Sequence, residues 1–109
     1  SRDFCYIENA VQANILAATS TDSKALNNIY NVAVGERTSL NELYDLIKKH
    51  LYKITKNSHS KLQYRDFREG DVRHSLADIS KASKLLGYKP KYRVKSSIKL
   101  TIDWHLGGK

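Results

Sequence analysis

The chain has 109 residues, 40% of them hydrophobic, which is enough for one domain with a modest core. Nineteen lysines and arginines against eleven aspartates and glutamates give a net charge of +8, which favours polyanionic partners: nucleic acid, a membrane surface or phosphorylated small molecules. No apolar run approaches the roughly 20 residues that span a bilayer, and the charged opening SRDFCYIEN is unlike a signal peptide. The single cysteine, Cys5, excludes an internal disulfide and a cysteine-rich zinc site.

The first predicted element is an amphipathic helix over residues 7–19, IENAVQANILAAT. Its apolar residues recur at helical spacing and share one face, which comprises Ile7, Val11, Ile15 and Ala18. Polar residues occupy most of the remaining surface. We therefore expect this apolar face to pack against an apolar neighbour.

A strand and a second helix are predicted next. Residues 29–34, IYNVAV, are rich in residues that favour β-structure and are followed by Gly35, which predicts a buried strand. Ser39 opens the helix SLNELYDLIKKHL, where Ser39 and Glu42 have the spacing of a capping box. The apolar stripe of this helix comprises Leu40, Leu43, Tyr44, Ile47 and Leu51.

A loop and a second strand are predicted in the middle of the chain. Residues 52–61, YKITKNSHSK, lack clear helical periodicity and predict a loop, with a frayed helix end at its start. Residues 61–68, KLQYRDFR, then alternate as in a strand, with Leu62 and Tyr64 on one face.

Two short helices are predicted to complete the chain. Asp78 is the expected N-cap of a helix that stops at Gly87, three residues before Pro90. The last helix is expected to begin at the serine pair of residues 96–97. Its apolar face comprises Ile98, Ile102 and Leu106.

Residues 68–75, REGDVRHS, predict a turn with a high density of charge. Gly70 tolerates a backbone conformation that other residues resist, and Asp71 is a common turn former. Arg68 and Asp71 would then place donors and acceptors in one pocket, which suits a ligand that carries phosphate and hydroxyl groups. The alternative is a solvated surface ion pair between these two residues, and the local pattern by itself favours this alternative, because most charged turns are only solvated.

Motifs for cofactors, metals and catalysis are absent from the sequence. No GxGxxG or GxxxxGK[ST] loop is present to hold a pyrophosphate. The four histidines lack the spacing of metal ligands, so we expect no metal site. Two YxxxK patterns, Tyr44 to Lys48 and Tyr52 to Lys56, arise easily by chance in a chain with seven tyrosines and many lysines. We therefore assign no catalytic residue.

The series RDFCYIENAVQANILAA, YNVAVGERTSLNEL and YRDFREGDVRHSLADISKASKLLGYKPKY resembles the C-terminal part of the extended short-chain dehydrogenase/reductase family. The nearest branch comprises the UDP-N-acetylglucosamine 4-epimerases of bacterial surface-polysaccharide synthesis. The likeness runs through about the whole chain. It implies an α/β parent protein of Rossmann type, whose substrate-binding C-terminal domain would span residues 1–109 as a mixed α+β piece with about four helices and two to three short strands.

The resemblance also implies which residues bind a UDP-sugar. Arg2 and Arg68 match the arginines that hold the diphosphate, and Asp71 matches the aspartate that takes the ribose hydroxyls. Ser75 stands where galactose-only enzymes have a bulky tyrosine, which favours the larger N-acetylated sugar. One departure is Asn9, where many relatives have an aspartate.

Two residues of the same turn are expected to lie elsewhere. Neighbouring side chains in an extended segment alternate between its two sides. Arg73 and His74 are therefore expected to point away from the ligand.

The activity implied by the resemblance is the NAD-dependent interconversion of UDP-N-acetylglucosamine and UDP-N-acetylgalactosamine, in which a hydride leaves C4 of the sugar and returns to its other face. NAD would be held by an N-terminal Rossmann domain that is absent from this chain, so the chain alone is expected to bind no cofactor and to be inactive. We expect a cytoplasmic parent homodimer. The expected partners of the chain are a UDP-N-acetylhexosamine and its own N-terminal domain, with no nucleic acid and no membrane.

Two readings from other classes stay open. The charge fits a small basic module that binds nucleic acid, although lysine and arginine are spread over the whole chain without a known nucleic-acid signature. The other alternative is a structural domain without a ligand.

Overall fold

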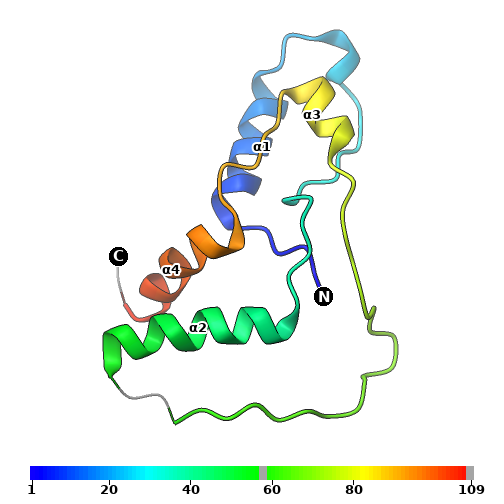
Figure 1. Ribbon diagram of the computed structural model, residues 1–109. Coiled ribbons are helices and arrows are strands. Elements are labelled where there is room, and N and C mark those ends of the chain that lie inside the picture. Colours follow the sequence, from blue (N-terminus) through cyan, green and yellow to red (C-terminus); the bar gives the residue numbers. More distant parts are fainter. Residues whose placement is uncertain (57–58, 108–109) are drawn as a thin grey trace.

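The computed structural model describes residues 1–56 and 59–107, and helices form nearly all the regular structure of these residues. The helices are α1 (Ile7–Thr19), α2 (Leu40–Thr55), α3 (Ser80–Leu86) and α4 (Val94–His105), with a short 3-10 helix, η1 (Ser23–Ala25). α1 and α3 pack together with η1 at one end of the molecule, and α2 packs against α4 at the other (Figure 1). The N-terminal segment runs between the two ends.

The described part of the chain is extended for its size. Its radius of gyration is 16.9 Å and its principal extents are 53 × 36 × 17 Å. A compact domain of this length has a radius of gyration of about 13 Å. Much apolar surface is therefore left uncovered within the chain itself.

The core lies between α1, η1 and α3. It is built around Tyr88, with Ala13, Ala25, Ala82 and Leu86 packed together. The Tyr88 ring is fully buried, and its hydroxyl donates a 2.6 Å hydrogen bond to the carbonyl oxygen of Ala33. Burial raises the pKa of Tyr88 to about 12, because the phenolate would lose its hydration. Small alanine side chains let the helices approach closely around this ring.

The predicted bounds of the first helix are confirmed, but the predicted packing face is wrong within this chain. Ile7, Val11 and Ile15 are exposed. The face turned to the core instead carries Asn9 and Ala13, which are buried. Hydrophobic periodicity identified the helix, but the small residues and the hydrogen bonds of Asn9 decide which side packs in this structure.

Asn9 joins α1 to the segment before α4. Its Oδ1 accepts hydrogen bonds from the backbone N–H groups of Lys91 and Tyr92, at 3.0 and 3.1 Å. Its Nδ2 donates to the carbonyl oxygen of Tyr92 at 2.8 Å. An amide can make this set of bonds, whereas an ionised carboxylate has no hydrogen to give to the carbonyl. These bonds explain why an asparagine suits position 9, where many relatives have an aspartate.

The predicted capping box of α2 is confirmed. The Ser39 hydroxyl accepts from the Glu42 N–H at 3.1 Å, and the Glu42 carboxylate accepts from the Ser39 N–H at 2.8 Å. These hydrogen bonds lower the pKa of Glu42. The helix continues to Thr55, beyond the predicted end at Leu51, and residues 57–58 of the predicted loop lie outside the described residues.

The two shorter helices begin at other residues than expected. α3 has Ile79 as its N-cap, although the Asp78 carboxylate still accepts from the Ser80 N–H at 2.9 Å. α4 starts at Val94, two residues before the serine pair, because the Ser96 hydroxyl accepts from the Arg93 N–H at 3.1 Å. The predicted stop of α3 at Gly87, which adopts a positive φ of 67°, is confirmed.

The two predicted strands are absent from the described residues, so the expectation of a mixed α+β piece is wrong here. A single antiparallel bridge joins Arg2 and Thr38. Residues 29–34 have no strand beside them, and the N–H group of Val34 donates to the Asp3 carboxylate instead. Residues 61–68 are exposed (Figure 1). A ladder needs a neighbouring strand, and this part of the chain offers none.

Candidate functional site

The turn predicted between residues 68 and 75 is confirmed. The N–H group of Asp71 donates to the carbonyl oxygen of Arg68 at 3.1 Å, which closes the turn. Gly70 has a φ of 78°, a conformation that residues with a Cβ rarely adopt. Its surroundings leave open space for a Cβ, so the backbone angle and not crowding favours glycine there.

Two arginines approach the carboxylate of this turn. Arg2 Nη2 lies 2.6 Å from Asp71 Oδ1, and Arg68 Nη2 lies 3.9 Å from Asp71 Oδ2. The local pair that the sequence suggests is therefore the weaker of the two. The Arg68 side chain is 89% exposed, so its guanidinium remains open to other partners. The structure thus brings together Arg2, Arg68 and Asp71.

The backbone around Arg2 is held by neighbouring segments. Arg2 exchanges two hydrogen bonds with Thr38, at 3.0 and 2.9 Å, just before the start of α2. The next residue, Asp3, accepts from the N–H groups of Val34 at 3.0 Å, Gly35 at 2.9 Å and Ala77 at 3.3 Å. The carboxylate of Asp3 therefore joins the N-terminal segment to two distant segments, at residues 34–35 and at residue 77.

Asp3 is a residue that sequence reasoning missed. Its partners lie 31, 32 and 74 residues away, so no local pattern could reveal them. The two N–H groups beside Gly35 are occupied by this carboxylate. They are consequently not arranged to hold a pyrophosphate.

A cavity of about 350 Å³ opens beside Arg2 and Asp71. Its walls are Ser1, Arg2, Ser39, Leu40, Asn41, Phe67, Asp71, Val72, Arg73 and His74. The expectation that Arg73 and His74 point away is therefore wrong. Ser75 is half-buried beside the cavity, and its N–H group donates to the carbonyl oxygen of Ser1 at 3.1 Å.

Positive charge dominates this cavity. Arg2 and Arg73 line the cavity together with Asp71, the one carboxylate of its walls, and Arg68 approaches Asp71 at 3.9 Å. Partial desolvation of the His74 ring lowers its pKa, and the nearby positive charges, including Arg37, lower it further. Guanidinium groups bind phosphates through paired hydrogen bonds, and a carboxylate accepts hydrogen bonds from vicinal hydroxyls. The arrangement suits a ligand that carries both groups.

The reactive side chains near the site show no sign of activation. Burial raises the pKa of the Cys5 thiol, which disfavours the thiolate needed for nucleophilic attack. The Tyr44 hydroxyl donates to the carbonyl oxygen of Ser60 at 2.9 Å, and Lys48 Nζ lies 5.7 Å from the centre of its ring. Tyr44 therefore anchors a neighbouring segment, and the geometry of this YxxxK pair offers no acid–base chemistry.

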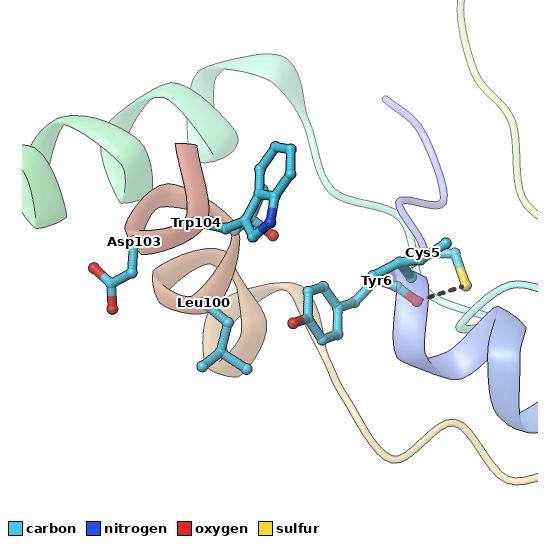
Figure 2. A pocket seen from close by; sticks show the side chains of 7 residues that line it. Cys5, Tyr6, Leu100, Asp103 and Trp104 are labelled. Atoms are coloured by element: carbon cyan, nitrogen blue, oxygen red, sulfur yellow. Dashed lines mark hydrogen bonds between the residues drawn. The ribbon is translucent and has the colours of Figure 1, made fainter. Parts of the chain in front are cut away.

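A second hollow has an apolar character. Figure 2 shows this cleft, of about 790 Å³, between the start of α1 and α4. Its walls are Cys5, Tyr6, Ile7, Leu100, Thr101, Asp103 and Trp104. It continues the exposed apolar face of α1 through Ile7. The cleft suits an apolar surface better than a charged ligand.

Residues 1–56 and 59–107 offer neither a metal site nor a membrane-spanning helix. These residues contain no group of three or more histidine, cysteine, aspartate or glutamate side chains that could hold a metal ion. None of the helices described there is both long and apolar enough to cross a membrane.

Comparison with known proteins shows a consistent set of relatives. The family model described as GDP-mannose 4,6 dehydratase matches residues 1–101. A putative UDP-glucose 4-epimerase of Methanocaldococcus jannaschii is 35% identical over 95% of this chain and 30% of the relative. A UDP-glucuronate 4-epimerase of Thermodesulfobacterium geofontis is 29% identical over 95% of this chain and 30% of the relative.

A dTDP-L-rhamnose 4-epimerase of Burkholderia thailandensis gives a similar result. It is 28% identical over 95% of this chain and 27% of the relative. The chain therefore spans less than a third of the length of these three curated relatives.

Proposed function

The chain belongs to the GDP-mannose 4,6 dehydratase family of extended short-chain epimerases and dehydratases, and from this premise we propose that it is the nucleotide-sugar-binding part of a 4-epimerase. The observation that carries the proposal is that Arg2 and Asp71 line one cavity and that Arg68 also approaches Asp71, at 3.9 Å. Relatives with three different sugar names share the 4-epimerase description. Each of these names contains a sugar linked to a nucleoside diphosphate, so a site for a nucleoside diphosphate is what the three relatives would share.

In the proposed complex the diphosphate lies between Arg2 and Arg68, and the ribose hydroxyls face Asp71. Arg2 already donates to Asp71, but a guanidinium has five N–H donors, so it can serve the carboxylate and a phosphate together. Arg68 is exposed and needs only a side-chain rotation to reach the ligand. The site is therefore largely formed before the ligand binds.

For the sugar, we propose the pair UDP-N-acetylglucosamine and UDP-N-acetylgalactosamine, in surface-polysaccharide synthesis. The support is Ser75, a small side chain beside the cavity at the position where a tyrosine would fill the space. The relatives named above carry other sugars in their names, and this pair rests on Ser75 alone.

The cofactor of the proposed epimerase is NAD, bound outside this chain. The residues present do not fit a dinucleotide: the sequence has no GxGxxG loop, and the N–H groups of Val34 and Gly35 are taken by Asp3. We place NAD in an N-terminal domain, as the relatives are about three times as long as this chain. The homodimer implied by the family stays a prediction.

Replacing Arg68 by alanine tests the binding proposal. A charge-assisted hydrogen bond is worth about 1.5–3 kcal/mol, so we expect the affinity for UDP-N-acetylglucosamine to fall at least tenfold. Titration calorimetry measures this change. Arg65→Ala is the matched control, because Arg65 is an exposed arginine of the same segment. Its guanidinium makes only a long hydrogen bond of 3.5 Å to Gln63 Oε1.

The same titration separates the alternatives. A nucleotide-sugar site should discriminate UDP from other nucleotides, whereas a nucleic-acid module should bind polynucleotides with an affinity that falls steeply as salt rises. Equal loss of affinity in Arg65→Ala and Arg68→Ala would show that general charge, not the site, binds the ligand. A well-folded chain that binds neither ligand would overturn the proposal for this chain.

The exposed apolar surface indicates where the N-terminal domain docks. Ile7, Val11 and Ile15 are exposed on α1, and Ile7 also lines the cleft that contains Trp104. Contiguous apolar surface of this kind marks an interface in most soluble proteins. We propose that this face, which is largely exposed in the described chain, is covered by the N-terminal domain.

The single tryptophan of the chain reports on this docking. Trp104 is 68% exposed, so its fluorescence should be that of a solvated indole. We expect a blue shift when the separately produced N-terminal domain is added, and a loss of that shift in the Ile15→Glu variant. An unchanged emission with the domain in excess would contradict the docking proposal and leave the nucleotide site unaffected.

A further inference from the structure

Phe67 is an apolar residue that the fold does not explain. It stands one residue before Arg68 and lines the cavity that holds Arg2 and Asp71. It is 68% exposed and is not part of the core cluster. An exposed aromatic ring inside a charged cavity is a feature that points to a ligand with a planar, weakly polar part.

We infer that Phe67, backed by Arg73, is the platform on which the base of a nucleoside diphosphate stacks. The Arg73 guanidinium lies 4.4 Å from the centre of the Phe67 ring. This contact leaves most of the ring uncovered, so a second planar group can lie against it. Stacking on aromatic side chains is a common way for proteins to hold a base.

The groups that line the cavity match the parts of a nucleotide. Phe67 offers a surface to the base, Asp71 offers acceptors to the ribose hydroxyls, and Arg2 offers donors to the phosphates. The cavity of about 350 Å³ is near the lower end of the 300–1,000 Å³ that is typical of ligand sites. It therefore suits the nucleoside diphosphate better than a whole nucleotide-sugar.

The segment that carries Phe67 is held against α2. The Tyr64 hydroxyl donates to Asn41 Oδ1 at 3.1 Å, and the Tyr44 hydroxyl donates to the carbonyl oxygen of Ser60 at 2.9 Å. Asn41 itself lines the cavity. These bonds place the aromatic ring next to the first turn of α2, where the base would enter. This inference rests on the proposed function and adds the recognition of the base to it.

The test compares UDP with inorganic pyrophosphate, which has the charge but no base. In titrations of the whole chain, Phe67→Leu should weaken the binding of UDP about tenfold, in line with the usual value of a base–aromatic stack. It should leave the binding of pyrophosphate within twofold. Phe67→Tyr, which keeps the ring, should retain the affinity for UDP.

Trp104→Leu is the matched control, because Trp104 is exposed to the same fraction, 68%, and lines the other cleft. It should change neither affinity. If Phe67→Leu leaves UDP binding unchanged while Arg68→Ala weakens both ligands, this inference is overturned and the proposed function stands. If the wild-type chain binds no UDP, both are overturned.

Discussion

Replacing Asn9 by alanine is expected to lower the free energy of unfolding by about 3 kcal/mol, because it leaves two part-buried N–H groups and one part-buried carbonyl without their partner. Asn9 is fully buried, and its bonds to Lys91 and Tyr92 join α1 to the segment before α4. Urea denaturation followed by circular dichroism measures this loss.

Asn14→Ala provides the control for that experiment. Asn14 lies on the same helix but is exposed, so its replacement should change the stability by less than about 0.5 kcal/mol. A similar small change for Asn9→Ala would show that water or a relaxed backbone replaces the three bonds. Asn9→Asp is informative beside it, since an ionised carboxylate can still accept from both N–H groups but cannot donate to Tyr92.

Replacing Asp3 by alanine is expected to lower the free energy of unfolding by about 2–3 kcal/mol. The same change is expected to weaken nucleotide binding. The carboxylate accepts from Val34, Gly35 and Ala77, and all three N–H groups lose their acceptor in the variant. The turn that carries Asp71 would then lose one of its connections to the segment before α2, while the one through Arg2 and Thr38 remains. Hydrogen exchange of these three amides, measured together with UDP affinity, tests both effects.

Asp66→Ala is the matched control for Asp3→Ala. Asp66 is an exposed carboxylate of the segment before the turn, and its side chain makes no hydrogen bond within the described residues. We expect Asp66→Ala to change neither the stability of the chain nor its affinity for UDP. Faster exchange at Val34, Gly35 and Ala77 with an unchanged UDP affinity would show that Asp3 supports the fold but does not position the site.

Local sequence patterns predicted the parts of the molecule whose stabilising contacts are also local. The capping box of Ser39 and Glu42 joins residues three apart, and the turn at Gly70 is closed across three residues. The bounds of α1 follow from the helical spacing of its own apolar residues. The turn pattern pointed to Arg68 and Asp71, the family resemblance added Arg2, and the structure places the three residues together.

The strands show the limit of local patterns. Residues 29–34 have the composition of a strand, yet a strand forms only when its backbone groups find those of a neighbour. The same reasoning applies to the face of α1. Ile7 and Val11 share an apolar face, but a face is buried only where another surface covers it. Both errors concern contacts that the described part of the chain does not provide.

The sequence by itself determined the helices of this protein, the charged turn and the family, because helix periodicity, capping residues and glycine act over a few neighbouring residues. Only the tertiary structure decided which face of α1 is buried, that Arg2 and not Arg68 is the main partner of Asp71, and that Asp3 and Asn9 hold distant segments together. These contacts join residues from 31 to 83 positions apart. Their energies depend on how the whole chain is arranged, and no short stretch of sequence contains that information.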